Sequence, residues 1–358
     1  MADWSELPIE LVELIANGLD EPEDFLSLSA VCHSWRLVYL SKRWTPAHQA
    51  PWLMLNEKQE NGVLLRRFFS LSKSKVYKLP LPEAHGCRCW GSSHGWIVTI
   101  DRGYKIFLLN PITRVWISLP PCRTLGKQII STNDWFGIIN KASVFKIRGE
   151  LVACAIYGKC CELAFARPGD MAWSTLQLHV PVYFCSIACF KDQIFALSMV
   201  GVLYFLQTDS RHPPGLKLIA APPKGEKGWQ QTYLVESSGH LLMVIGYKDS
   251  NWMKKMKFKV YRFDFNAETW SAVEDLAGSV LFIDDNLCSS VSTSLCHKRN
   301  SVYFMADNLD YMLTTDTRFM GQYMNVYDLK DKSCEVYCIG HHDRFSYTCP
   351  SWVFTTLW

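Results

Sequence analysis

Residues Ile97 to Pro111 read IVTIDRGYKIFLLNP, and their pattern indicates the architecture of most of the chain. Two apolar runs, 97–100 and 105–109, flank the polar turn Asp101-Arg102-Gly103, and Asn110-Pro111 ends the second run. Short runs rich in β-branched and aromatic residues, bounded by Gly, Asn, Asp and Pro, are typical of β-strands joined by tight turns. The stretch therefore predicts a pair of adjacent strands.

The same pattern of strands and turns recurs along most of the chain. We place units of a few strands each at residues 52–80, 88–120, 142–180, 184–221, 231–276 and 280–338. A period of about 40–50 residues is the spacing of β-propeller blades. We therefore expect an all-β domain over residues 50–358, a β-propeller of about six blades; a β-sandwich with extra strands is the alternative.

The last apolar run predicts how such a ring closes. Residues 352–356, Trp-Val-Phe-Thr-Thr, read as a strand that can pair beside residues 52–55. This pairing would remove an exposed strand edge.

The first 44 residues differ from the rest in both period and charge. They predict three helices: one from about Leu7-Pro8, with Pro8 in the first turn and Ser5 or Glu6 as its cap, one over 23–32 and one over 34–44. They carry eight acidic and three basic residues, whereas the remainder carries 26 acidic and 34 basic ones. Opposite charge balances indicate two segments with different roles.

The first predicted helix has more apolar surface than a small bundle can bury. One stripe comprises Leu7, Leu11, Leu14 and Ile15, and the other comprises Ile9, Val12, Ala16 and Leu19. A unit of about 40 residues has one small core and is near the lower limit for folding alone. We therefore expect one stripe to be left for another domain or another protein.

Composition limits the remaining function classes. The net charge of +3 is too small to indicate a nucleic-acid partner, the acidic N-terminus is unlike a secretory signal, and no apolar run approaches the length of a membrane span. The 14 cysteines lack the regular spacing of a disulfide framework, so we interpret them as reduced thiols. We therefore expect a protein of the cytoplasm and/or nucleus.

The N-terminal residues Leu7-Pro8-x-Glu10-Leu11, then Val31-Cys32-x-x-Trp35-Arg36, with Trp44 closing, resemble the F-box. Leu-Pro-x-Glu-Leu alone is a weak signal, but the joint match over about 40 residues is specific. Segments of the β domain, among them Gly91–Ile97, Leu109–Thr113 and Phe282–Asn286, resemble plant F-box proteins whose C-terminal domain was long catalogued as a domain of unknown function related to kelch-like propellers.

This resemblance implies an F-box at residues 1–46 that binds the Skp adaptor and, through it, cullin and RING subunits. It assigns adaptor binding to six residues: Leu7, Pro8, Leu11, Ile15, Val31 and Cys32. Trp35 and Trp44 are expected to set the packing of the third helix.

Other groups of residues resemble catalytic, metal-binding or charged binding motifs, but structural explanations fit them better. Gly91-Ser92-Ser93-His94-Gly95 precedes a strand and does not match a hydrolase nucleophile elbow, so we interpret it as a turn. His85, Cys87, Cys89 and His94 lack a second ligand pair with zinc spacing. Lys254, Lys255, Lys257 and Lys259 read as a solvated hairpin, and Asp284-Asp285 as a turn. We expect no catalytic centre, no cofactor and no metal.

These observations favour a non-catalytic receptor of a Skp–cullin–F-box ubiquitin ligase that presents a protein target for ubiquitination and degradation. Two alternatives remain: a scaffold or decoy that binds the adaptor without ligase activity, and a propeller ligand-binder or enzyme. The target surface is expected on loops at one face, with Trp135, Phe136 and Trp229 as candidates.

Overall fold

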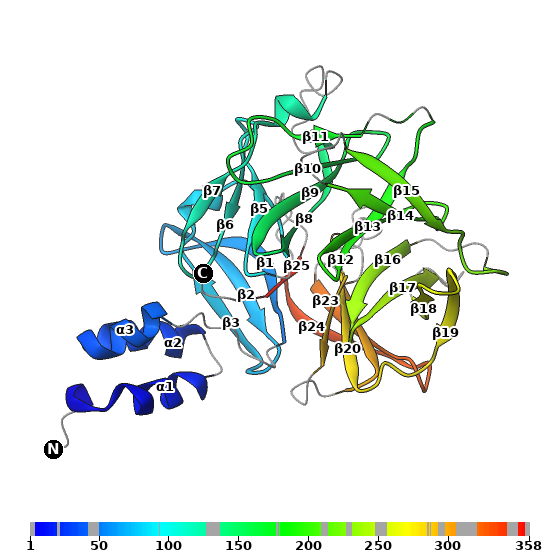
Figure 1. Cartoon of the computed structure of the whole chain (residues 1–358). Coiled ribbons are helices and arrows are strands. Elements are labelled where there is room, and N and C mark those ends of the chain that lie inside the picture. The colour runs from blue at the N-terminus through cyan, green and yellow to red at the C-terminus, as the bar shows by residue number, and fades with distance from the viewer. Residues whose placement is uncertain are drawn as a thin grey trace.

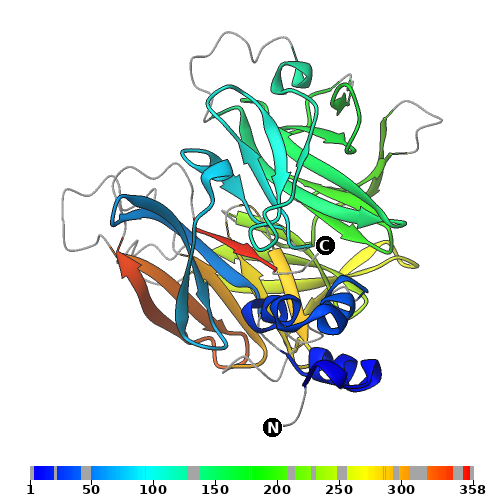
Figure 2. The same cartoon turned by 90° about the vertical axis from the view of Figure 1, so that its left-hand side faces the viewer.

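The part of the chain that the structure describes forms three short α-helices beside a ring of six β-sheets (Figure 1). The computed structural model describes residues 4–19, 22–41, 50–92, 94–126, 137–176, 178, 180–208, 214–226, 231–247, 256–284, 286, 288–292, 298–305, 321–341 and 350–354. Turning the molecule by 90° shows that the helices lie together on one side of the ring (Figure 2). None of the helices in these residues is long and apolar enough to cross a membrane.

The N-terminal helices fall close to the predicted positions. A 3-10 turn, η1 (Trp4–Glu6), precedes three α-helices: α1 (Ile9–Asn17), α2 (Pro22–Val31) and α3 (His33–Ser41). The expected start of the first helix was wrong in detail. Pro8 occupies the N-cap position rather than the first turn, and its carbonyl accepts the amides of Leu11 and Val12, while no side-chain hydrogen bond caps the helix there.

Each sheet of the ring is one propeller blade, and the first three blades have four strands each. Blade 1 consists of β25 (Ser351–Val353), β1 (Trp52–Glu60), β2 (Val63–Ser70) and β3 (Lys75–Leu79). Blade 2 consists of β4 (Arg88–Trp90), β5 (Ile97–Ile100), β6 (Ile106–Leu109) and β7 (Trp116–Ser118), between the short 3-10 turns η2 (Pro82–Ala84) and η3 (Cys122–Leu125). Blade 3 consists of β8 (Ile139–Ile147), β9 (Glu150–Tyr157), β10 (Glu162–Ala166) and β11 (Ser174–Thr175).

The last three blades follow the same antiparallel order, with one exception. Blade 4 consists of β12 (Phe184–Phe190), β13 (Gln193–Ser198), β14 (Leu203–Gln207) and β15 (Gly215–Ala220). Blade 5 consists of β16 (Gln231–Ser237), β17 (His240–Tyr247), β18 (Lys257–Asp264) and β19 (Thr269–Val273). Blade 6 has five strands: β21 (Cys288–Ser292), β20 (Ser279–Ile283), β22 (Ser301–Met305), β23 (Gly321–Asp328) and β24 (Cys334–His341). Within blade 6, β20 pairs with β22 in parallel.

The six-bladed propeller confirms the expected fold of the large domain. The sandwich alternative was wrong because the strands form six separate sheets, whereas a sandwich has two packed ones. The predicted pairing of the last strand is also confirmed: Val353 pairs with Trp52, and Trp352 pairs with Leu53.

The apolar runs are continuous because each blade is covered on both faces. In β17, Leu241, Met243 and Ile245 pack into the core shared with blade 4. The alternating residues Leu242 and Val244 pack into the core shared with blade 6. Successive strand side chains point to opposite faces, so a strand buried on both sides must be apolar throughout.

The ring closes between blade 6 and blade 1. Phe282 of β20 and Trp352 of β25 pack with their ring centroids 4.9 Å apart, and Leu53 and Leu55 of β1 join the same core. The Trp352 indole Nε1 donates to the Ile283 carbonyl at 3.1 Å. The last strand is therefore held to both blades that it joins.

A buried polar cluster, which we call the axial clasp, reinforces this closure; it comprises Gly91, Asp284, Asn286 and Ser351. Asp284 accepts hydrogen bonds from the Trp352 amide at 2.6 Å, the Ser351 hydroxyl at 2.9 Å and the Asn286 amide at 2.7 Å. The Asn286 side chain donates to the Gly91 carbonyl at 3.0 Å and accepts the Ala142 amide at 2.7 Å. The clasp thus ties blade 6 to blades 1, 2 and 3.

Candidate functional site

The helical unit has a small core of its own. The core comprises side chains from all three α-helices that are at most 9% exposed: Val12, Ala16, Leu28, Trp35 and Val38. The Trp35 indole Nε1 donates to the Trp4 carbonyl at 3.0 Å and so ties α3 to η1. Val12 and Ala16 come from the second of the two predicted stripes, so that stripe supplies the contribution of α1 to the core.

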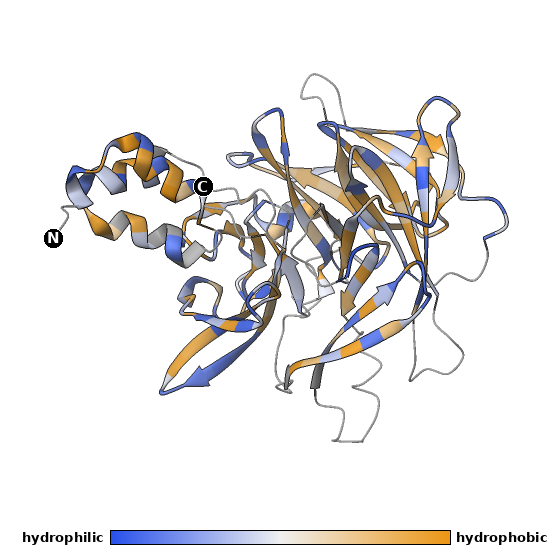
Figure 3. Ribbon diagram, turned by 90° about the horizontal axis from the view of Figure 1, so that it is seen from below, coloured by the Kyte–Doolittle hydropathy of each residue, from blue (hydrophilic) through white to orange (hydrophobic). Residues whose placement is uncertain are grey.

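A set of large apolar side chains on η1 and the same helices remains in solvent, and we call it the helical apolar face; Leu11 and Leu14 lie on one side of α1, whereas Ile9 lies on another. Its members are Trp4 (60% exposed), Ile9 (47%), Leu11 (46%), Leu14 (66%), Val31 (50%) and Leu37 (45%). The helices stand to one side of the strands, and several of their turns are coloured as apolar (Figure 3). Exposed apolar residues on one small unit are a common feature of protein–protein interaction sites.

The residues predicted to bind an adaptor fall on or beside this face. Leu11, Val31 and Pro8 are exposed, while Leu7, Ile15 and Cys32 are half-buried against the helical core. The structure therefore brings all six together on one unit, with three of them most available for contact. Trp35 lies in the core of the unit, and Trp44 lies outside the described residues.

Sequence reasoning missed some members of the helical apolar face. Leu14 lies on the predicted outward stripe, three residues after Leu11, and is its most exposed member. Ile9 shares a stripe with the buried Val12 and Ala16, but it is the first residue of α1 and remains 47% exposed. The spacing of the outward stripe could have identified Leu14, whereas the position of Ile9 depends on where the helix begins.

The helical unit meets the propeller at Ile112, in the turn between β6 and β7. Ile112 packs both against the helical core and against the core between blades 1 and 2. The buried Asn110 shapes this turn, because its side-chain oxygen accepts the amides of Ile112 and Thr113, each at 3.0 Å. This is an Asx turn, which fixes the backbone on which Ile112 is presented.

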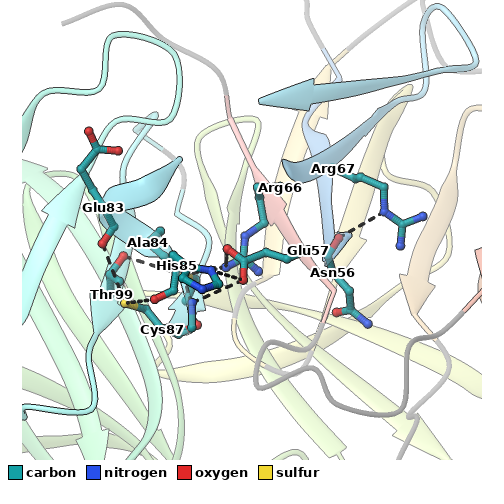
Figure 4. Close-up of polar contacts among 11 residues, drawn as sticks. Asn56, Glu57, Arg66, Arg67, Glu83, Ala84, His85, Cys87 and Thr99 are labelled. Atoms are coloured by element: carbon teal, nitrogen blue, oxygen red, sulfur yellow. Dashed lines mark hydrogen bonds and ion pairs between the residues drawn. The ribbon is translucent and has the colours of Figure 1, made fainter. Parts of the chain in front are cut away.

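Polar residues at the junction of blades 1 and 2 have structural partners. The buried Arg66 guanidinium lies 3.0 Å from the Glu57 carboxylate and donates to the Ala84 carbonyl at 3.2 Å. The second Glu57 oxygen accepts the Gly86 amide at 3.3 Å and lies 3.4 Å from His85 Nδ1 (Figure 4). The ion pair thus joins β1 and β2 to the loop that enters blade 2.

The neighbouring cysteines have the character of buried thiols. Burial raises the pKa of Cys87 to about 12, so its thiolate is scarce near neutral pH. Its thiol donates to the Glu83 and His85 carbonyls at 3.8 and 3.5 Å. Among the described residues, no group of three or more His, Cys, Asp or Glu side chains could hold a metal ion.

The other motifs also have structural explanations where the structure describes them. The segment around Ser92 is a turn in which the Ser92 hydroxyl donates to the Trp96 carbonyl at 2.7 Å; Ser93 lies outside the described residues. Lys257 and Lys259 are exposed and alternate with buried Phe258 along β18, as a solvated strand face requires. Lys254 and Lys255 lie outside the described residues.

Asp284 differs from the simple turn residue that the sequence indicated, because it is buried within the axial clasp. The adjacent Asp285 lies outside the described residues. The same is true of the three proposed target-binding aromatics, Trp135, Phe136 and Trp229, which therefore remain predictions.

Comparison with known proteins identifies relatives of the whole chain. The family described as the KIB1-4 beta-propeller matches residues 68–337. The F-box protein SKIP23 of Arabidopsis thaliana is 26% identical over 359 residues, covering 85% of this chain and 84% of SKIP23. The F-box protein At2g17036 of the same plant is 24% identical over 407 residues, covering 99% of this chain and 96% of that protein. The second alignment includes the N-terminal helices as well as the ring.

Proposed function

Because the chain belongs to the KIB1-4 β-propeller family of plant F-box proteins, we propose that it is the substrate-recognition subunit of a Skp–cullin–F-box ubiquitin ligase. The helices bind the Skp adaptor, which links the chain to cullin and RING subunits. The propeller holds a protein target, which is then ubiquitinated and degraded. This role places the protein in the cytoplasm and/or nucleus, and the chain itself performs no catalysis.

The observation that carries the proposal is the helical apolar face. The helices have filled their own core with Val12, Leu28 and Val38, and still expose Leu11, Leu14 and Val31. Fully burying a wholly exposed side chain of this kind contributes about 1.5–3 kcal/mol, and these side chains are already about half buried, so each adds about half of that. Several such contacts are needed to exceed the estimated association cost of about 4–15 kcal/mol, and this face supplies them.

Charge around the face supports an interaction with a protein. Glu6 and Glu10 are exposed beside the apolar residues of α1, and Arg36 is exposed on α3. A polar rim around an apolar centre is the usual anatomy of an interface between proteins. Rim charges contribute little affinity but favour one partner orientation.

The mechanism that follows is proximity. A target bound to the propeller is kept at high effective concentration near the ubiquitin-loaded enzyme at the other end of the assembly. Ile112 lies between the two units, so its packing helps to fix how the target is presented.

The test is adaptor binding by the full chain carrying Leu11→Ser together with Leu14→Ser. Both side chains are about half exposed, so the helices should stay folded while the interface loses about 2 kcal/mol or more, which is a loss of affinity of about 30-fold. Affinity for purified Skp adaptor is measured by calorimetry. The matched control carries Leu218→Ser and Val336→Ser, at exposed positions on outer strands of the propeller.

Equal adaptor affinity of the double variant and wild type would refute the assignment of this surface. Co-purification of cullin with the wild-type chain separates the ligase role from that of a scaffold or decoy. Adaptor without cullin in that sample would contradict the ligase proposal.

A further inference from the structure

Blades 3 and 4 present a second group of exposed apolar residues, far along the chain from the helices. We call it the blade 3–4 patch and define it by Val180, Tyr183, Met199 and Val200, which are between 46% and 72% exposed. The Met199 amide donates to the Tyr183 carbonyl at 2.7 Å, so the two segments lie side by side. Val200 is at the tip of a tight turn closed by a hydrogen bond from the Gly201 amide to the Ser198 carbonyl at 2.9 Å.

Hydrogen bonds connect this patch to the start of β8, the inner strand of blade 3. The Phe184 amide donates to the Cys161 carbonyl at 2.9 Å, which places the turn 158–161 next to Tyr183. On its other side the same turn is held by β8, because the Asn140 side chain donates to the Gly158 carbonyl at 2.8 Å. The next residue of β8 is Lys141.

Lys141 brings a half-buried positive charge to this end of the ring. Its ammonium lies 5.3 Å from the centre of the Tyr233 ring, a cation–π contact with the inner strand of blade 5. Burial raises the pKa of Cys185 to about 11, and the charge of Lys141 opposes that increase, which places the ammonium near this thiol. The Tyr233 ring and the Cys185 thiol thus border Lys141, and a carboxylate brought by a partner would gain from a charge-assisted hydrogen bond with its ammonium.

The charge and the apolar residues together define the chemistry of an occupant. A lysine presents a compact point charge, whereas phosphate recognition typically uses clustered arginines with paired donors. The patch at the same end of the ring offers an aromatic ring, a flexible Met side chain and two Val side chains, which suit apolar side chains of varied shape.

We propose that the blade 3–4 patch and Lys141 form the target-binding site, which takes an extended peptide segment with an Asp or Glu side chain next to apolar ones. The carboxylate pairs with Lys141, and the apolar side chains pack on Tyr183, Met199 and Val200. This inference rests on the proposed function, since it identifies the kind of target segment that the receptor holds.

The location of the site fits a receptor with two separate interfaces. Arg88 lies beside the start of β8, because its guanidinium donates to the Ile139 carbonyl at 2.9 Å. Strand pairing puts Arg88 opposite Ile100, and Leu109 opposite Ile97 at the other end of the blade. The turn that carries Ile112 follows Leu109, so the helical unit contacts the end of the propeller opposite to the proposed site.

The experiment selects peptides from a display library of random 12-residue sequences on the purified full chain bound to its adaptor. We expect the recovered peptides to be enriched in Asp or Glu next to Leu, Ile, Val or Phe. Lys141→Met, which keeps an apolar stem, and the pair Met199→Ser with Val200→Ser should each weaken binding of these peptides about tenfold or more. Lys141→Glu should shift a fresh selection toward peptides with Lys or Arg in place of the acidic residue.

Two control variants test the position of the site. Lys191→Glu reverses an exposed charge in the turn at the far end of β12, and Val336→Ser removes an exposed apolar residue on an outer strand. Both should bind the selected peptides as wild type does, and the melting temperature of every variant is measured beside binding.

Recovery of no peptide, recovery of peptides without an acidic residue, or equal losses in the Lys141 and Lys191 variants would each overturn the proposal. The selection needs no cullin or RING subunit, so a failure of ligase assembly would leave this result unchanged. Conversely, loss of peptide binding would leave the adaptor measurement on Leu11 and Leu14 unaffected.

Discussion

Replacing Asp284 tests whether the axial clasp holds the ring closed. The carboxylate is only 3% exposed and accepts the Trp352 amide of the last strand, the Ser351 hydroxyl and the Asn286 amide. Asp284→Ala removes all three acceptor contacts at once. The Ser351 hydroxyl can rotate, but the two backbone amides cannot find a new acceptor without moving the strand or the loop.

The expected loss in the free energy of unfolding follows from the two backbone amides, those of Trp352 and Asn286, that lose their acceptor. A hydrogen bond to a charged group contributes about 1.5–3 kcal/mol net, so two orphaned amides cost about 3–6 kcal/mol. Asp284→Asn keeps one carbonyl oxygen and should cost about half as much. For a domain of this size, 1 kcal/mol corresponds to roughly 2–4 °C, so Asp284→Ala should lower the melting temperature by at least about 6 °C.

The assay is thermal unfolding of the purified full chain, followed by the far-ultraviolet signal of the strands. The matched control is Asp264→Ala, whose carboxylate accepts the amides of Asn266 and Ala267 at 2.8 and 3.1 Å but is exposed, so water can replace it. If the two alanine variants lost the same few degrees, the buried clasp would stabilise the ring no more than an ordinary exposed turn does.

Two further predictions concern other parts of the ring. Gly91→Ala should let a protease cut the last strand faster, because a Cβ at Gly91 would lie 2.0 Å from the Trp352 carbonyl oxygen; unchanged cleavage would contradict this close approach. Glu226→Gln should lower the melting temperature at pH 7, with the difference shrinking as pH falls below about 4. Burial raises the pKa of Glu226, but hydrogen bonds from Lys259, Tyr247 and Tyr261 outweigh it and leave the pKa lowered, so its contribution is present above the ordinary carboxyl range and is lost on acidification. A difference that stayed constant from pH 7 to pH 3 would show that the carboxylate charge is unimportant there.

The architecture of the large domain could be predicted because local pattern and global fold agree. Each blade buries both faces, so runs such as residues 241–245 are apolar throughout and stand out from the turns between them. The final strand could be placed beside Trp52 because a closed ring leaves no other partner for the first strand's free edge.

Features that depend on contacts between distant segments could not be predicted. The parallel pairing of β20 with β22 joins strands separated by β21, and no turn residue specifies it. Asp284 looked like a turn residue because its partners Ser351 and Trp352 lie nearly seventy positions further along the chain. Lys141 could not be singled out, because the contact of its ammonium with Tyr233 joins strands of blades 3 and 5.

The helical apolar face was partly predictable for a physical reason. The helical period separates two stripes on α1, and core size dictates that only one can be buried. The period alone could not show that Ile9 would extend beyond the core or that Ile15 would be half-covered by it.

The strand that completes blade 1 is synthesised after every other strand of the ring. The helices leave the ribosome first, and domains generally fold in the order in which they are made. A transcript truncated before codon 351 would thus yield a chain with intact helices but with β1 as an exposed edge strand, which can pair with strands of other molecules. Under the proposed function, such a fragment would occupy adaptor molecules without delivering a target, and would thereby antagonise the full-length protein.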